Sequence, residues 1–357
     1  MNSTPIRILV VDDSALYRQS IRNVLRGVEN AQCCGTAKDG VDALQKIDEL
    51  DPDLLTLDVQ MPDMNGIELL REIKRRRLRP KAIMVSCLTA EGAKVTTDAL
   101  MEGAFDFILK PSGSDSVANR QRLQEALQEK INAFHDSTLS AGEQRLSRPA
   151  SDSEVGDTVP VPKAACEAVI IGTSTGGPAA LKAILSRFPK QLAAPVLVVQ
   201  HMPATYTLSL ATRLDSICPL DVVEATDKME AVAGKVIIAA GGKQMNLSRP
   251  NGRLTVGVVD APAEHGVRPS VDFLLRSAID VLDGNALAVI LTGMGRDGLM
   301  GCRALKQAGG NVFAQNQSDC VVYGMPKAVI EEQLADRTLP LGKVAPAIVR
   351  HLKRSRK

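Results

Sequence analysis

Short runs of β-branched and aliphatic residues alternate with amphipathic stretches along the first third of the chain. Five such runs predict strands: Ile6–Val11, Ala31–Ala37, Leu54–Leu57, Lys81–Ser86 and Phe105–Leu109. Between them apolar positions recur at helical spacing, as over Ser14–Gly27 and Gly40–Leu50. Strands that alternate with helices predict βαβ units, and therefore a doubly wound parallel α/β sheet with helices on both faces.

A second alternation begins at Ala168. Its predicted strands are Ala168–Ile171, Pro195–Gln200, Val236–Ala240, Leu254–Val259, Leu287–Thr292 and Asn311–Ala314, with helices such as Pro178–Arg187 and Leu299–Ala308. From Asp136 to Lys163, small and polar residues replace the large apolar ones, which predicts a flexible linker. No fixed-period repeat relates the two halves. We therefore expect a first α/β domain over 1–124, a helix end and linker over 125–164, and a different doubly wound α/β domain over 165–352.

The composition fits two globular domains and argues against several other classes of protein. The 357 residues are 45% hydrophobic and 24% charged, with a net charge of +2. The N-terminus lacks the basic and long apolar segments of a signal peptide, and no apolar run reaches the roughly 18 residues of a membrane helix. The seven cysteines show no CxxC spacing. We expect a cytoplasmic, reduced protein without a disulfide framework or a zinc site.

The chain contains a basic run, Lys74–Lys81, of a kind that can bind nucleic acid. It lies at the predicted end of a helix, where cations complement the helix dipole. The near-neutral net charge offers no further support for a polyanionic partner. We interpret the run as a solvated helix end and expect no nucleic-acid binding.

Acidic residues and one lysine follow three of the predicted strands in the first half. Asp12 and Asp13 follow the first strand, Asp58 the third, and Lys110 the fifth. Parallel strands bring their carboxyl ends to one edge of a sheet, so these side chains are expected to meet. Three carboxylates favour a hard cation such as Mg²⁺, and a metal-held Asp58 can attack an acyl or phosphoryl donor. The alternative is that the acidic pair only caps the helix that begins near Ala15.

The segment Gly172–Gly176 reads G-x-S-x-G, the pattern of a nucleophile elbow between a strand and a helix. Small neighbours let the hydroxyl of Ser174 stand exposed on a tight turn. The helix that begins at Pro178 adds backbone amide donors close by. The alternative is a glycine-rich turn without chemistry.

A serine nucleophile needs a base and an acid. His201 directly follows the next predicted strand, whereas His135 and His351 are assigned to the linker and the C-terminal tail, and His265 to a loop. Asp297 follows the apolar run LAVILT, which predicts a buried strand. The order Ser, His, Asp differs from the Ser, Asp, His of α/β-hydrolases, so a triad is expected on another fold.

The segment Gly293–Gly298 also fits G-x-G-x-x-G, a dinucleotide-binding pattern. Such a site needs an acid at the end of the following strand, about 20 residues further on. That strand ends in Gln315 and Asn316, so the pattern lacks its ribose ligand. A nucleotide-sensing module remains an alternative function for the second half, as does a binding domain without catalysis.

Residues 1 to about 124 resemble a response-regulator receiver domain, a flavodoxin-like fold. The resemblance rests on the acidic pair, on Asp58 before MPDMNG, on Ser86 and on Lys110–Pro111. It implies that Asp58 is the phosphoacceptor and that Ser86, Phe107 and Lys110 form the switch. Ser86 stands where Thr is common, and Phe107 where Tyr often occurs. The Mg²⁺ ligands implied by the resemblance are Asp12, Asp13, Asp58 and the carbonyl oxygen of Gln60.

Residues from about Cys166 to Leu341 resemble the catalytic domain of the bacterial chemotaxis protein-glutamate methylesterase family. The matching stretches are IGTSTGGP, VVQHMP, HGVRPSVDFL, LTGMGRDG and CVVYGMPKA. The order of receiver, linker and esterase matches as well. The resemblance implies that Ser174 is the nucleophile, that His201 is the general base and acid, and that Asp297 orients His201.

The same resemblance implies an oxyanion site, a reaction and partners. Backbone amides at Thr175 and Met294 would stabilise the oxyanion. The reaction would be hydrolysis of glutamate methyl esters, releasing methanol, and deamidation of glutamines, on the cytoplasmic helices of chemoreceptors. A histidine kinase would phosphorylate the receiver in the presence of Mg²⁺ and so activate the esterase, which needs no cofactor; contact with the membrane would be only through the receptors. The HGVRPS spacing departs from the family pattern of His directly before Arg-Pro-Ser, so His265 receives no role.

Overall fold

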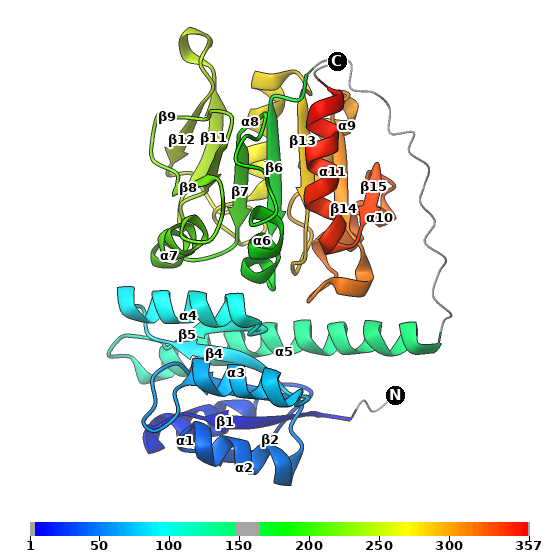
Figure 1. Ribbon diagram of the computed structural model, residues 1–357. Coiled ribbons are helices and arrows are strands. Elements are labelled where there is room, and N and C mark those ends of the chain that lie inside the picture. Colours follow the sequence, from blue (N-terminus) through cyan, green and yellow to red (C-terminus); the bar gives the residue numbers. More distant parts are fainter. Residues whose placement is uncertain (1–3, 147–164, 356–357) are drawn as a thin grey trace. The chain divides into compact units, whose positions relative to one another are not determined.

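The computed structural model describes residues 4–146 and 165–355, and the side chains of 4–138 and 165–355. The chain separates into two compact units, Met1–Gly142 and Glu143–Lys357 (Figure 1). Each unit is described by itself. In the described residues, no helix is both long enough and apolar enough to cross a membrane.

The first unit is a single parallel sheet with helices on both faces. The strand order is β2-β1-β3-β4-β5, and every neighbouring pair is parallel. Helices α2, α3 and α4 pack beside one another, while α5 bonds to the α1–β2 connection through Gln124 and Gln128. The elements are β1 (Ile6–Val11), α1 (Ala15–Leu25), β2 (Ala31–Ala37), α2 (Gly40–Leu50), β3 (Leu54–Asp58), α3 (Gly66–Arg76), β4 (Lys81–Ser86), α4 (Ala90–Glu102), β5 (Asp106–Leu109) and α5 (Ser116–Leu146).

The helix starts of this unit follow from local capping. Ser14 caps α1 and accepts a hydrogen bond from the Tyr17 amide. Asn65 and Glu68 form a capping box at the start of α3, in which each side chain accepts from a backbone amide of the other. Because Ser14 supplies the cap of α1, the side chains of Asp12 and Asp13 are not needed to cap this helix. The capping alternative for that pair is therefore wrong.

The linker expected from Asp136 to Lys163 differs from the structure in its first part. Helix α5 continues without a break to Leu146, so residues 136–146 are helical. This stretch contains no proline, and its one glycine, Gly142, weakens a helix by only about 1 kcal/mol. A helix already nucleated upstream extends at one hydrogen bond per residue. The remainder of the expected linker, 147–164, lies outside the described residues.

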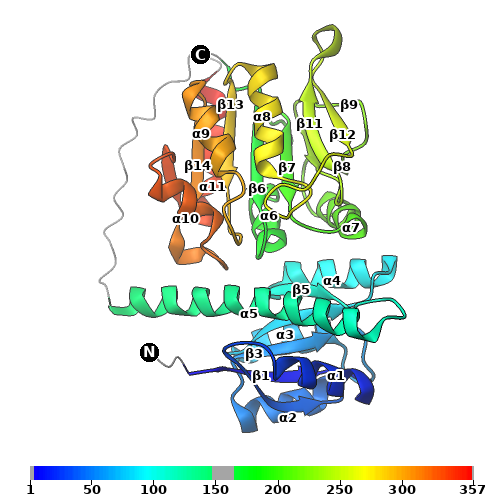
Figure 2. The same ribbon diagram turned by 180° about the vertical axis from the view of Figure 1, so that it is seen from behind.

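The second unit is a seven-stranded parallel sheet in the order β15-β14-β13-β6-β7-β10-β8. Helices α11, α6 and α7 lie on one face (Figure 1), and α8, α9 and α10 lie on the other (Figure 2). Its elements are β6 (Ala168–Thr173), α6 (Gly177–Leu185), β7 (Val196–Gln200), α7 (Ala204–Asp215), β8 (Asp221–Glu224), β9 (Met229–Glu230), β10 (Lys235–Ile238), β11 (Gln244–Ser248), β12 (Thr255–Val259), α8 (Val271–Leu282), β13 (Ala286–Ile290), α9 (Leu299–Gln307), β14 (Asn311–Gln315), α10 (Met325–Glu331), β15 (Arg337–Leu339) and α11 (Leu341–Arg354).

Not every strand of this unit belongs to the parallel sheet. The predicted strand Leu254–Val259 corresponds to β12, which pairs antiparallel with β11 and β9 in a separate three-stranded sheet. Its expected place in the βα alternation is therefore wrong. This small sheet packs against α8 through β11. An apolar run of five residues specifies a strand but not the partner or the direction of pairing.

The chain direction through the large sheet defines where a site can form. From β6 the chain runs outward through β7 toward β10 and β8, and it returns on the other side of β6 at β13. Strands β13, β6 and β7 are direct neighbours, and all of their residues are buried. A doubly wound sheet opens a crevice at such a reversal, beyond the carboxyl ends of its strands. The predicted doubly wound architecture of both domains is confirmed.

Candidate functional sites

The acidic residues of the first unit meet at the carboxyl ends of neighbouring strands. Asp12 follows β1, Asp58 ends β3, and Lys110 follows β5. The Lys110 Nζ lies 2.9 Å from Asp12 Oδ2 and 3.0 Å from Asp58 Oδ2. Both carboxylates are buried, at 0% and 7% exposure. The sequence prediction that these three side chains converge is confirmed.

Burial and charge act against each other in this cluster. Burial raises the pKa of Asp58, and the charge of Asp12 adds to that rise, although Lys110 opposes it. Burial disfavours the charge on Lys110, but its bonds to the two carboxylates outweigh this and raise its pKa. The ring of Tyr17 lies 4.5 Å from the Lys110 Nζ and further encloses the ammonium group. Lys110 therefore remains a cation that ties the two carboxylates together.

The donor set of the cluster fits a hard divalent cation. Asp12, Asp13 and Asp58 each offer a carboxylate oxygen, and these oxygens all lie within 4.8 Å of one another. Asp13 is exposed, so a cation bound there keeps access to water. Mg²⁺ prefers carboxylate oxygens and retains several waters. One lysine does not balance three carboxylates, and a divalent cation would supply the missing positive charge.

The remaining predicted receiver residues surround this cluster. Ser86 ends β4 and is buried, and its Oγ lies 3.4 Å from the carbonyl oxygen of Gly92 in α4. Phe107 lies in β5 and is half-buried. Gln60 is exposed, two residues beyond Asp58. The switch role of Ser86 and Phe107 and the use of the Gln60 carbonyl remain predictions.

In the second unit, Ser174 stands on a tight turn directly after β6. The Ser174 amide donates to the carbonyl oxygen of Thr292 at 3.1 Å, and the Ser174 carbonyl accepts from Gly177 at 2.8 Å. Gly176 precedes α6 with φ +79°, a conformation that favours glycine. The residues on either side of Ser174 are buried, while Ser174 itself is partly exposed. The elbow pattern thus produces a tight turn with a partly exposed serine.

The loop after β13 lies directly against this serine. A Cβ at Gly293 would come within 2.8 Å of the Ser174 Cβ, so only glycine allows this approach. The Thr173 hydroxyl donates to the Thr292 carbonyl at 2.8 Å and joins the ends of β6 and β13. Gly293, the first glycine of the turn before Asp297, is therefore required by the packing of the two strand ends, a role other than nucleotide binding.

His201 and Asp297 form a hydrogen-bonded pair beside the elbow. His201 follows β7, and its amide donates to the Thr173 carbonyl at 3.2 Å. The His201 Nε2 lies 2.8 Å from Asp297 Oδ2, with side-chain exposures of only 9% and 3%. A carboxylate only accepts, so this contact places a proton on Nε2 and leaves Nδ1 as the basic nitrogen. Within the described residues, no hydrogen bond joins Ser174 Oγ to His201.

Asp297 is held at the start of α8 by three further donors. Its Oδ1 accepts from the Ser270 hydroxyl at 2.8 Å and from the Asp272 amide at 3.1 Å. Its Oδ2 accepts from the Val271 amide at 2.7 Å. Burial pushes the Asp297 pKa upward, but His201 and these amides outweigh it and hold the pKa below its usual range. The positive end of a helix therefore keeps this buried carboxylate ionised.

The predicted oxyanion donors lie on the two loops that meet at the serine. Thr175 follows Ser174 on the elbow, and Met294 lies in the loop after β13. Among the described residues, the Met294 amide has no acceptor. An amide without an acceptor in the protein can serve a substrate oxygen. The roles of Thr175 and Met294 remain predictions.

Sequence reasoning missed two residues that position the triad candidates. Ser270 belongs to the HGVRPS stretch, and in the structure it caps α8 and donates to Asp297. Gln200 donates from Nε2 to the Ser174 carbonyl at 2.9 Å and so connects β7 to the elbow. A serine before an apolar helix is a readable capping signal. Nothing local to Gln200 indicates its bond across the sheet.

Two other expectations are clarified by the structure. His351, assigned to a tail, lies in α11 with 6% exposure, and its ring meets Phe313 edge-on at 5.6 Å. That assignment is wrong, and burial lowers the His351 pKa. Gln315, at the position of a ribose-binding acid, accepts a hydrogen bond from the Thr292 amide at 2.8 Å. The Gln315 side chain is thus engaged within the protein, and no acid stands at the end of this strand to bind a ribose.

Comparison with known proteins agrees with both halves of this description. A family model described as CheB methylesterase matches residues 169–348, and one described as response regulator receiver domain matches residues 8–129. Fold and families together define a response regulator whose output domain is an enzyme.

Relatives extend the match over the whole chain. The protein-glutamate methylesterase/protein-glutamine glutaminase of Desulfotalea psychrophila is 41% identical, and that of Thermotoga maritima is 42% identical. Each alignment covers 98% of this chain and 99% of the relative. The crystal structure of the Thermotoga maritima CheB methylesterase catalytic domain matches with a TM-score of 0.51 and 44% identity, over 52% of this chain and 97% of that one. The chain belongs to the CheB methylesterase family.

Proposed function

We propose that this protein is a phosphorylation-activated serine hydrolase of chemotactic adaptation. It hydrolyses glutamate methyl esters on the cytoplasmic helices of chemoreceptors and deamidates glutamines at such positions. The relatives named above carry both activities in their names. The proposal places the enzyme in the cytoplasm, in contact with the membrane only through its receptor substrates.

One observation carries the enzymatic part of the proposal. Ser174, His201 and Asp297 stand at the carboxyl ends of three neighbouring strands, at the reversal point of a doubly wound sheet. The 2.8 Å contact from His201 to Asp297 orients the imidazole with its free nitrogen available. A nucleophile, a base and a group that orients the base are the parts that acyl transfer needs.

In the acylation step, Ser174 Oγ attacks the ester carbonyl carbon. His201 Nδ1 takes the serine proton, and Asp297 stabilises the imidazolium that forms. The negative charge that develops on the carbonyl oxygen is met by the amides of Thr175 and Met294. The bond to the methoxy oxygen then breaks, and His201 returns its proton to the leaving group. The products are methanol and an acyl-enzyme.

Water completes the cycle by the same route. His201 removes a proton from a water molecule, and the water oxygen attacks the acyl carbon. The bond from the acyl carbon to Ser174 Oγ then breaks, and His201 returns the proton to Oγ, leaving a free glutamate side chain. A glutamine substrate follows the same path, except that the protonated leaving group is ammonia. Both activities therefore depend on one set of residues.

The receiver controls this reaction through Asp58. Asp12, Asp13, Asp58 and the Gln60 carbonyl would hold Mg²⁺, which would supply charge neutralisation for phosphoryl transfer. A histidine kinase provides the phosphoryl group, Asp58 accepts it, and Lys110 contacts the added charge. Phosphorylation brings about −1.5 to −2 charges into a cluster whose three carboxylates already exceed the charge of its one lysine. That change is sufficient to rearrange the surrounding loops and relieve inhibition of the esterase.

The proposal is tested by replacing the nucleophile. Ser174→Ala should abolish methanol release from methylated receptor, ammonia release from receptor glutamines, and labelling by a fluorophosphonate probe. Ser186→Ala is the matched control, because Ser186 is an exposed serine at the other end of α6. Labelling or turnover that persists in Ser174→Ala would reject the nucleophile, and loss of activity in both variants would indicate a folding defect.

A further inference from the structure

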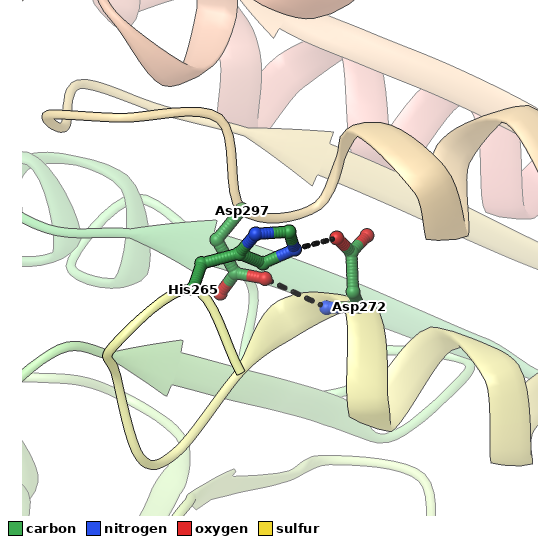
Figure 3. A group of neighbouring side chains, drawn as sticks. All are labelled: His265, Asp272 and Asp297. Atoms are coloured by element: carbon green, nitrogen blue, oxygen red, sulfur yellow. Dashed lines mark hydrogen bonds and ion pairs between the residues drawn. The ribbon is translucent and has the colours of Figure 1, made fainter. Parts of the chain in front are cut away.

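A tight turn beside the triad carries a histidine that the esterase chemistry does not use. Residues 264–267 form a two-residue hairpin, with Glu264 and Val267 bonded to each other through both backbone pairs. The two central residues, His265 and Gly266, have φ values of +52° and +75°. Positive φ at both central positions is the geometry of a type I′ turn. The turn presents the imidazole of His265 toward the start of α8 (Figure 3).

His265 is bonded to a buried carboxylate. Its Nε2 lies 2.9 Å from Asp272 Oδ2, and the two side chains are 47% and 1% exposed. Asp272 Oδ1 accepts from the Gly301 amide at 2.6 Å in the first turn of α9. Burial raises the pKa of Asp272, and the nearby Asp297 adds to the rise, although Gly301 and His265 oppose it. Asp272 therefore depends on its partners to stay ionised.

Asp272 lies next to the carboxylate of the triad. Carboxylate oxygens of Asp272 and Asp297 and a ring nitrogen of His265 all lie within 4.8 Å of one another. The Asp272 amide also donates to Asp297, as Figure 3 shows. The four acceptor positions of Asp297 are filled by protein donors, so the group does not form a cation site. Two histidine–aspartate pairs stand side by side instead, one of them the His201–Asp297 pair.

Among the ionisable groups around the two pairs, His265 is the one whose change of charge can act on Asp272. Arg276 of α8 is paired with Glu264 of the turn, and this contact is the main cause of the raised pKa of Arg276. Cys302 of α9 faces both carboxylates, and its pKa is raised by burial and by their charges, so it stays neutral. Histidine is the side chain that changes charge between pH 5 and 8. The other charged groups of the loop pair with one another: Asp260, Lys243 and Arg268.

We propose that His265 is a positioning residue of the esterase. Through Asp272, it sets the charge beside Asp297 and thereby the pH at which His201 becomes a free base. When His265 is protonated, its positive charge cancels the negative charge of Asp272. Asp297 then contributes the uncompensated negative charge beside His201. When His265 loses its proton, Asp272 adds a second negative charge, which favours the protonated form of His201. Because the inference assigns His201 as the base, it rests on the proposed function.

The electrostatic role makes opposite predictions for the two partners. His265→Gln retains a side-chain amide donor but removes the positive charge, so the His201 titration midpoint should move to higher pH. Asp272→Asn retains an acceptor for Gly301 but removes the negative charge, so the midpoint should move to lower pH. Each shift should be about 0.5–1 pH unit for a unit charge a few ångströms beyond Asp297. The double variant should lie between the two single ones.

The experiment is an NMR titration of the full chain with histidine labelled at ¹³Cε1, in which substitution of each of the four histidines assigns its signal. Glu264→Gln is the matched control, since it loosens the same turn by removing the exposed contact to Arg276. It should move the midpoint by less than about 0.2 pH unit, because solvent and salt screen that pair. His265 is half exposed, so His265→Gln leaves the core intact and stands as a test even if Asp272→Asn does not fold.

Opposite shifts in His265→Gln and Asp272→Asn, with none in Glu264→Gln, support the proposal. Shifts of the same sign, no shift in His265→Gln, or an equal shift in Glu264→Gln would overturn it. The titration needs no substrate, so it separates this inference from the proposed function. If the midpoint moves and the acidic limb of kcat/KM for ester hydrolysis moves with it, both stand. If the midpoint moves while no esterase activity exists, only the proposed function fails.

Discussion

Replacing Asp297 with asparagine perturbs the site at one atom. The aspartate accepts two hydrogen bonds at each oxygen, from His201 and Val271 on one side and from Ser270 and Asp272 on the other. Asparagine replaces one oxygen with an amino group that only donates. Whichever way the amide is turned, it faces a backbone N–H that also only donates. The substitution therefore cannot be accommodated by a simple flip.

The structure allows the two consequences to be estimated separately. A buried donor left without an acceptor costs about 1–3 kcal/mol of stability. The catalytic cost is larger, because a His201 that no longer donates from Nε2 presents the wrong tautomer to Ser174. Loss of the orienting carboxylate in a serine triad reduces kcat by about 10⁴, equivalent to about 5.4 kcal/mol in the activation free energy. Activity should thus fall far more than stability.

The assay is methanol release from methylated receptor, measured together with urea unfolding of each variant. Asp280→Asn is the matched control, because Asp280 lies exposed on the same helix, α8. We expect Asp297→Asn to retain its fold and lose about 10⁴ in kcat, with Asp280→Asn unchanged. A turnover of Asp297→Asn within tenfold of the parent would refute the orienting role of the carboxylate.

Three further predictions follow from the two sites. Asp58→Asn should keep the basal esterase rate and lose the acceleration that acetyl phosphate and Mg²⁺ give the parent; an accelerated variant would place the phosphoacceptor elsewhere. A fragment of residues 165–357 should hydrolyse methyl esters faster than the unphosphorylated full chain, and a rate no higher than that of the full chain would argue against inhibition by the receiver. The Asp297 pKa is depressed in the fold, so its contribution to stability is complete above the unfolded pKa of about 3.9 and is lost as the pH falls through the lower folded value. Urea unfolding should therefore show the stability advantage of the parent over Asp297→Asn shrinking below about pH 4, and an advantage that grows on acidification would contradict the assignment.

The positions of the chemical groups could be predicted because strand ends are legible in the sequence. Apolar runs locate the buried strands, and in a parallel sheet their carboxyl ends share one edge. Asp58, Lys110, Ser174 and His201 each come directly after or at the end of such a run, and Asp297 lies in the loop that follows one. The direction in which a strand pairs is harder to predict. The expected place of β12 in the parallel sheet is wrong because an apolar run is compatible with antiparallel pairing too.

The partners of Asp297 could not be predicted, since they come from a different part of the chain. Ser270 and Asp272 are about 25 residues away from Asp297 in sequence, and only the tertiary fold brings the start of α8 to it. The burial of His351 has a similar cause. A short amphipathic segment near the C-terminus predicts a helix, but only the packing of α11 beside α6 turns its histidine into the interior. Contacts of this kind depend on tertiary structure.

The most direct test of the central claim is methanol release from a methylated chemoreceptor by the purified full chain, with and without acetyl phosphate and Mg²⁺. We expect slow release from the unphosphorylated enzyme and faster release once the phosphodonor is added. Absence of methanol under both conditions, with the receptor shown to be methylated and the protein folded, would contradict the claim.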